Sequence, residues 1–138
     1  MKKVCICSSF KFYEKVQELA EKLKEAGIEC FIPLPSKKFR NQDKPDEFVA
    51  DFDNMSEQEK LQEAKRMALE HFDRMNRADC IFILSPTGYV GKSVCMEIGY
   101  AHAKKIPVYA SSKLEDFFIM SMVDKIVSEQ EFIEILRQ

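Results

Sequence analysis

Two patterns of hydrophobic and polar residues alternate along this chain and predict strands and helices in turn. Short apolar runs at residues 4–7, 28–34, 81–84, 107–110 and 125–127 are typical of strands that are buried on both faces. Between the strands, apolar residues recur at helical spacing, most clearly within segments 12–23, 61–75 and 94–101. Ser-x-x-Glu capping boxes at residues 56–59 and 128–131 indicate where two of the helices begin.

This alternation predicts an α/β fold, a flavodoxin-like or Rossmann-like doubly wound parallel sheet of five strands in three α/β/α layers. No repeat or linker interrupts the pattern, so residues 1–138 are expected to form a single domain. Residues 36–55 are polar and lack a clear period, which indicates a long loop with one helical turn. A short helix is expected to run from a cap at Ser112 through Met122.

Composition and charge narrow the class of protein. The chain has 138 residues, with 21 Lys and Arg against 23 Asp and Glu, which gives a net charge of −2. A binder of nucleic-acid polymers normally carries a basic excess. The longest apolar runs have about five residues, well below the roughly 20 of a membrane span, and the apolar stretch after Met1 is too short for a signal peptide. We therefore expect the mature protein to begin here and to be cytoplasmic.

The five cysteines also favour a reducing compartment. Their number is odd, no C-x-x-C motif occurs, and each lies within an apolar stretch, so buried free thiols are expected. The two histidines, His71 and His102, are not paired with a cysteine at zinc-ligand spacing. We predict neither a metal nor a cofactor.

The loop after the third predicted strand is the best candidate for chemistry. Residues 87–93 resemble a phosphate-binding P-loop, but Pro86 stands where its first glycine is required. Free backbone N–H groups at the following helix start would still favour an anion. Glu97 lies four residues after Ser93 on the same helix face, where the helix dipole is expected to keep it ionised. The alternative is a helix-start glutamate that only complements the dipole.

Ligands of such sheets bind at the carboxyl ends of the strands. Residues 8–11, after the first strand, and residues 85–91, after the third, should therefore meet at one edge of the sheet. A phosphoacceptor receiver domain is disfavoured, because it would need an aspartate at the end of the third strand. This chain has Leu84-Ser85 there.

The segment from Asp79 to Pro107, with Gly-Tyr-Val-Gly at residues 88–91 and Glu-Ile-Gly at residues 97–99, resembles the core of the nucleoside 2-deoxyribosyltransferase family. The pattern is most similar to small bacterial and phage members and is related to nucleoside 5′-monophosphate N-glycosidases. The resemblance is specific over residues 71–110 and looser elsewhere.

The resemblance implies cleavage or exchange of an N-glycosidic bond in a small nucleoside or nucleotide. Glu97 would attack the anomeric carbon, the base would leave, and the glycosyl ester would be resolved by another base (transferase) or by water (hydrolase). The residues implied to line the sugar and base pocket are Ser8, Ser9 and Phe10. Those implied to contact the sugar or a 5′-phosphate are Gly88, Tyr89, Gly91 and Ser93.

The chain departs from the family pattern at two catalytic positions. At the position of Gly91, classical transferases carry a sugar-contacting aspartate, and the nucleotide hydrolases of the family carry a serine that helps to hold the phosphate. The absence of the aspartate slightly favours the hydrolase branch. Ser93, two residues further on, would take the place of the hydrolases' serine. The family carries a second acidic residue on the helix before the third strand, and the matching position in this chain is His71, with Asp73 nearby. Either side chain would donate a proton to the leaving base. The alternative for His71 is a structural histidine on a helix face.

Three further expectations concern partners. The family implies a homodimer or homotetramer with shared sites, in which Asp116 would reach a neighbouring subunit. The apolar segment 117–122 is either core or subunit interface, and the basic segment 37–40 either reaches a phosphate or is simply solvated.

The main alternative to an enzyme is a non-catalytic nucleotide-binding module of the same fold.

Overall fold

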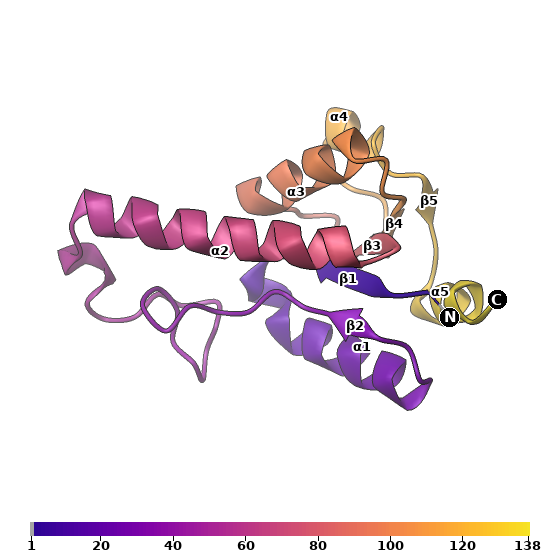
Figure 1. Cartoon of the computed structure of the whole chain (residues 1–138), viewed down its shortest axis with the longest axis horizontal. Coiled ribbons are helices and arrows are strands. Elements are labelled where there is room, and N and C mark those ends of the chain that lie inside the picture. The colour runs from indigo at the N-terminus through magenta and orange to yellow at the C-terminus, as the bar shows by residue number, and fades with distance from the viewer. Residues whose placement is uncertain (1) are drawn as a thin grey trace.

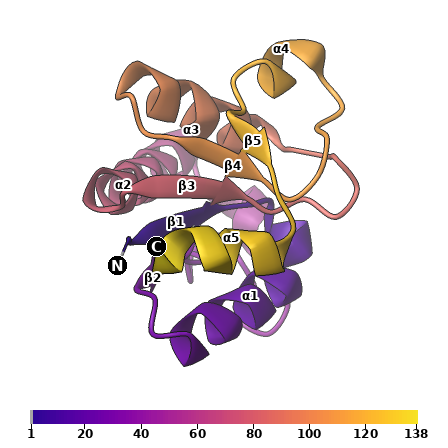
Figure 2. The ribbon, with the colours of Figure 1, turned by 90° about the vertical axis from the view of Figure 1, so that its right-hand side faces the viewer.

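The computed structural model describes residues 2–138 and contains a five-stranded parallel sheet (Figures 1 and 2). The strands lie in the order β2-β1-β3-β4-β5, and each pairs with its neighbours in parallel. Their bounds are Val4–Cys7 (β1), Cys30–Phe31 (β2), Cys80–Ile83 (β3), Val108–Ala110 (β4) and Lys125–Ile126 (β5). This order confirms the predicted fold and places the point where the winding reverses between β1 and β3.

Helices cover both faces of the sheet, because alternate residues of each central strand point to opposite sides (Figure 2). Val4 and Ile6 of β1 pack in one core with α1 (Tyr13–Glu25) and α5 (Glu129–Arg137). Cys5 and Cys7 pack in a second core with α2 (Glu57–Arg77) and α3 (Lys92–Ala103). The short helical segments are η1 (Phe10–Phe12), η2 (Phe52–Asn54) and α4 (Phe117–Met120).

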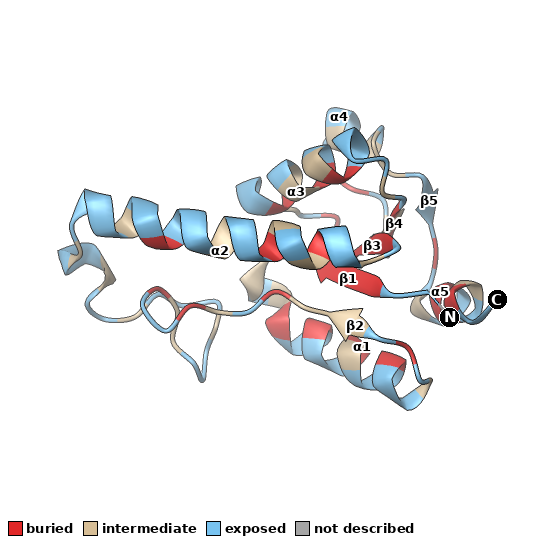
Figure 3. Ribbon diagram, in the orientation of Figure 1, coloured by how far each residue is buried: buried red, intermediate tan, exposed pale blue. Residues whose placement is uncertain are grey.

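Several predicted boundaries are confirmed and others are wrong. Both capping boxes form, with Ser56 and Ser128 as the N-caps of α2 and α5. The second strand is only two residues long, because the prolines at 33 and 35 cannot donate hydrogen bonds to a ladder. The N-cap of α4 is Asp116 rather than Ser112. Leu61, the first residue of the predicted apolar stripe 61–75, is 63% exposed, because the first half of α2 extends beyond the sheet (Figure 3).

The extended half of α2 runs beside the long loop, and one buried cluster joins them. Glu63 is buried and accepts a hydrogen bond from Ser36 Oγ of the loop. Arg66 donates from Nε and Nη2 to both carboxylate oxygens of Glu63, at 2.6 and 2.8 Å. Hydrogen bonding from Arg66, reinforced by Ser36, lowers the pKa of Glu63 to about 2.

Replacing Glu63 by glutamine is expected to lower the free energy of unfolding by about 1–2 kcal/mol, because a buried charge-assisted hydrogen-bond pair is lost. Since the folded state lowers the pKa of this carboxylate, its contribution is present above the unfolded pKa and disappears as the pH falls toward 2. Urea unfolding at neutral and acidic pH measures both effects. Glu70→Gln, which breaks an exposed pair with Arg66, is the control and should change little; equal losses in the two variants would contradict the assignment.

The cysteines are less uniformly buried than predicted. Cys5, Cys7 and Cys80 are buried and free, whereas Cys30, on the edge strand β2, and Cys95, on α3, are only half-buried. Within residues 2–138, none of the helices has the length and apolar character that crossing a membrane would require.

Candidate active site

The loops that follow β1 and β3 meet at the carboxyl edge of the sheet, as predicted. Ser8 Oγ donates a hydrogen bond of 2.7 Å to the carbonyl oxygen of Leu84. The Lys11 ammonium lies 3.9 Å from the centre of the Tyr89 ring. This edge is the topological switch point, where ligands of doubly wound sheets bind.

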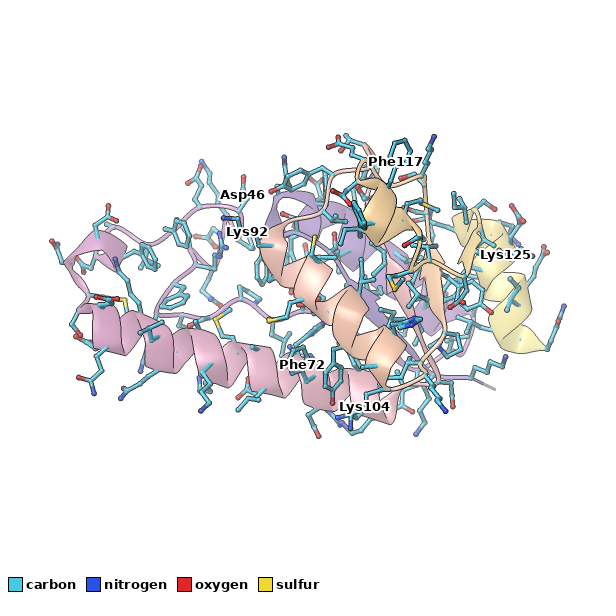
Figure 4. All side chains as sticks on the ribbon, turned by 90° about the horizontal axis from the view of Figure 1, so that it is seen from above. Asp46, Phe72, Lys92, Lys104, Phe117 and Lys125 are labelled. Atoms are coloured by element: carbon cyan, nitrogen blue, oxygen red, sulfur yellow. The ribbon has the colours of Figure 1, made fainter. Side chains whose placement is uncertain are left out.

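Beside this edge, a cavity of about 370 Å³ lies among α2, α3, the start of η1 and the long loop. Viewed from above, Phe72 of α2 lies between α2 and α3 (Figure 4), where its ring stacks on that of Tyr100 with ring centres 4.2 Å apart. The cavity wall is mainly aromatic and aliphatic, with a few polar side chains, as is usual for small-molecule sites. Its lining residues are Phe10, Pro33, Leu34, Phe39, Arg40, Phe48, Phe52, Ala64, Met67, Ala68, His71, Arg74, Ser93, Met96 and Glu97.

Glu97 of α3 and His71 of α2 meet in the wall of this cavity. His71 Nε2 lies 3.4 Å from Glu97 Oε1, and the two side chains are only 5% and 13% exposed. The other ring nitrogen, Nδ1, accepts a hydrogen bond of 3.2 Å from Arg74 Nε. The packing of α2 against α3 thus brings together a buried carboxylate and an imidazole that are 26 positions apart in the chain.

Two thiols of β1 lie behind this pair. The Sγ atoms of Cys7 and Cys5 are 3.5 and 3.8 Å from His71 Nε2. Contact with Cys5 and burial raise the pKa of the Cys7 thiol, so Cys7 remains protonated. Hydrogen bonding from Cys7, with a smaller effect of His71, lowers the pKa of Cys5 to about 6.

Burial raises the pKa of Glu97, while His71, the Cys7 thiol and Arg74 act in the opposite direction. The sequence predicted that the helix dipole would keep this carboxylate ionised. In the structure, burial is the largest influence on this pKa and acts against ionisation. The carboxylate is therefore held where its charge is poorly solvated, which makes it more reactive than an exposed one.

Cys5, Cys7 and His71 form a buried cluster that could hold a metal ion, because their ligand atoms all lie within 4.8 Å of one another. Spacing along the chain does not reveal this cluster. A metal on Nε2 would require the lone pair of that nitrogen and an outward-facing Nδ1–H. Arg74, which has only N–H donors, instead occupies Nδ1. The hydrogen bonding around His71 thus favours a proton on Nε2 over a metal.

Four of the predicted site residues line this one cavity: Glu97, His71, Ser93 and Phe10. Asp73, the alternative to His71, is exposed and forms an ion pair of 3.2 Å with Arg77. The remaining predicted residues are not part of the cavity wall: Ser8, Ser9, Gly88, Tyr89, Gly91 and Asp116.

Those remaining residues have clear local roles. The Ser9 hydroxyl accepts a hydrogen bond from Lys11 N at the start of η1, and Gly91 is the N-cap of α3. Asp116 caps α4 by accepting from Ile119 N. Gly88 has φ +88°, and a Cβ at this position would lie 2.6 Å from the Lys113 carbonyl oxygen, so only glycine fits.

The long loop supplies a part of the cavity wall that the sequence analysis touched only through the basic segment 37–40, and its aromatic residues were not predicted. The Arg40 guanidinium lies between the rings of Phe10 and Phe48, at 5.0 and 4.4 Å from their centres. Phe48 in turn stacks on Phe52, with ring centres 4.1 Å apart. The sequence did contain a signal for this wall, because the otherwise polar segment 36–55 includes three phenylalanines, Phe39, Phe48 and Phe52. Arg74 was also missed, because one arginine on a charged helix face carries no signal of its own.

Comparisons with known proteins agree with the fold. The family model described as nucleoside 2-deoxyribosyltransferase matches residues 6–130. A conserved protein from Enterococcus faecalis V583 has a similar crystal structure, with TM-score 0.65, 15% identity, and 100% of this chain and 98% of that chain covered. A 2-deoxyribosyltransferase from Bacillus psychrosaccharolyticus is similar with TM-score 0.63, 14% identity, and 95% and 90% coverage. No curated protein matches.

The strand order defines an α/β protein of the doubly wound class, with a cavity beside its switch point. Because the family model covers most of the chain, the protein belongs to the nucleoside 2-deoxyribosyltransferase family.

Proposed function

We propose that the protein cleaves or exchanges the N-glycosidic bond of a nucleoside or nucleoside 5′-monophosphate, with Glu97 as the nucleophile. A carboxylate oxygen of Glu97 forms a bond to the anomeric carbon, and the bond from that carbon to the base nitrogen breaks. Water or a second base then displaces the glycosyl ester and frees the carboxylate. Family membership supports glycosyl transfer on nucleosides.

The observation that carries this proposal is the position of Glu97. It is the carboxylate in the cavity wall, it is nearly buried, and it faces the imidazole of His71, which we propose as its catalytic partner. The aromatic rings of Phe10, Phe48 and Phe52 offer apolar surface to a base, while Ser93 offers a hydroxyl to the sugar or its phosphate. Gly91, which leaves no acid at the sugar-contacting position, favours hydrolysis over transfer.

The test is a panel of deoxynucleosides, ribonucleosides and their 5′-monophosphates, incubated with the protein and followed by chromatography of free base. The proposal predicts base release from at least one substrate, and base exchange when a second base is added if the transferase branch applies. Absence of both release and exchange across the panel would overturn the enzymatic assignment. Thermal stabilisation by a nucleotide without turnover would instead select the non-catalytic binding module.

We also propose that the protein forms a homodimer or homotetramer that walls the cavity with a second copy. Phe117 and Phe118 of α4 are 79% and 85% exposed, next to Asp116, and adjacent exposed aromatic rings are typical of interfaces.

Replacing Phe118 by aspartate is expected to shift the protein toward a monomer, because a charge would be desolvated in the interface. Sedimentation velocity over a range of concentrations measures this shift. Phe118→Tyr, which retains the aromatic ring, should remain associated. A wild-type protein that is monomeric at every concentration would contradict the proposal.

A further inference from the structure

Arg74 is the nearest charged neighbour of His71 on the side away from Glu97. It lies three residues after His71 on α2, lines the same cavity, and donates from Nε to His71 Nδ1 at 3.2 Å. A guanidinium has five N–H donors, no acceptor, and does not lose a proton in proteins. His71 Nδ1 must therefore accept through its lone pair, which leaves the proton of a neutral imidazole on Nε2.

The Nε2 side of the ring faces three groups. They are Glu97 Oε1 at 3.4 Å, Cys7 Sγ at 3.5 Å and Cys5 Sγ at 3.8 Å. Glu97 Oε1 is the nearest of the three to Nε2, and a carboxylate oxygen is a stronger hydrogen-bond acceptor than sulfur. A proton on Nε2 thus has its best partner in the proposed nucleophile.

We propose that Arg74 is a positioning residue that selects the Nε2–H tautomer of His71, so that the imidazole donates to Glu97 and holds its carboxylate ionised and oriented. The choice of tautomer follows from the contacts alone. Its value for catalysis rests on the proposed function, in which Glu97 is the nucleophile.

This tautomer changes the role of His71. An imidazolium would place an Nδ1–H against the Nε–H of Arg74, so the arginine opposes double protonation of the ring. A neutral imidazole that keeps its Nε2 proton is a hydrogen-bond donor to Glu97 rather than the acid that protonates the leaving base. The departing base then takes its proton from water.

The experiment is nitrogen-15 NMR of the histidine side chains at neutral pH, which distinguishes protonated from unprotonated ring nitrogens. In the wild type, His71 should carry its proton on Nε2 and have a bare Nδ1, while exposed His102 serves as an internal reference. In Arg74→Glu, the new carboxylate accepts from the ring and the proton should move to Nδ1. Arg74→Met should give a mixture of tautomers, and Arg74→Lys, which retains a donor, should keep the wild-type pattern.

Arg77→Met is the matched control, because it removes the same charge from the same helix end without contacting His71. It should leave the His71 signals unchanged. A wild-type His71 protonated on Nδ1, or doubly protonated, would overturn the proposal. So would a tautomer that is the same in wild type, Arg74→Met and Arg74→Glu, and thermal melts would establish that the variants compared are folded.

Activity gives a second, separable readout. Arg74→Met should lower kcat about tenfold, the effect of one lost hydrogen bond to the catalytic pair, and Arg74→Lys should restore most of it, while Arg77→Met matches the wild type. An unchanged kcat in Arg74→Met would overturn the positioning role. A wild type inactive on every substrate would defeat the proposed function and leave the tautomer result standing.

Discussion

Replacement of Glu97 by glutamine is expected to lower base release or exchange by at least about a thousandfold, the scale of losing a covalent nucleophile. Glutamine has nearly the same shape, so the cavity should still bind the nucleoside. It lacks the negatively charged oxygen that forms the glycosyl ester. Steady-state rates on the best substrate of the panel measure the effect. Glu115→Gln, an exposed glutamate outside the cavity, is the control and should be fully active.

The same variant is expected to be more stable than the wild type at neutral pH. Burial raises the pKa of Glu97, so the folded state binds this proton more tightly than the unfolded chain. That contribution is complete below the unfolded pKa and is lost as the pH rises through the folded pKa. At neutral pH, the ionised side chain therefore costs stability that glutamine does not.

Thermal melts at two pH values test this sign. The Tm of Glu97→Gln should exceed that of the wild type at neutral pH, and the difference should shrink near pH 4, where the wild-type carboxyl is increasingly protonated. Activity of the wild type should fall as the pH is lowered through the raised pKa of Glu97. A lower Tm for the variant at neutral pH would mean that the donors around the carboxylate outweigh its desolvation.

Loss of the His71 side-chain donor is expected to have the second-largest effect. His71→Met keeps an apolar side chain of similar reach but leaves Glu97 without its contact at 3.4 Å. A hydrogen bond to a charged group contributes about 2 kcal/mol, so kcat should fall roughly thirtyfold. His71→Gln, which can place an N–H near the former Nε2 position, should retain most of the activity.

The comparison of the two His71 variants separates two roles. If the ring only donates a hydrogen bond to Glu97, the glutamine variant approaches the wild type and the methionine variant does not. Equal and larger losses in both, together with loss of the basic limb of the pH profile, would show that His71 is a proton donor to the base. The same rate assay on the panel substrate measures both variants.

Sequence patterns predicted the local elements well where a chemical signal marks the boundary. Ser56 and Ser128 open their helices through capping boxes, and Val94, Ile98 and Ala101 of α3 are buried as their spacing indicates. The placement of Glu97 next to the carboxyl edge of the sheet followed from the strand-loop-helix order. These features depend on contacts between residues close in the chain.

What depends on distant contacts could not be predicted in the same way. Cys5 and Cys7 lie more than sixty positions before His71, and only the packing of α2 over β1 brings their sulfur atoms to the imidazole. The exposure of Leu61 depends on how far α2 projects beyond the sheet, which helical periodicity does not report. The sign of the pKa shift of Glu97 required knowledge of its burial, because desolvation and the helix dipole act in opposite directions.

The measurement that tests the central claim most directly is capture of the covalent intermediate. The protein is mixed with a substrate from which it releases base, quenched within the turnover time, digested, and mapped by mass spectrometry. The account predicts a glycosyl adduct, with or without a phosphate according to the substrate, on the peptide that contains Glu97, and its absence in Glu97→Gln. Base release that continues in Glu97→Gln, or an adduct on another side chain, would contradict it.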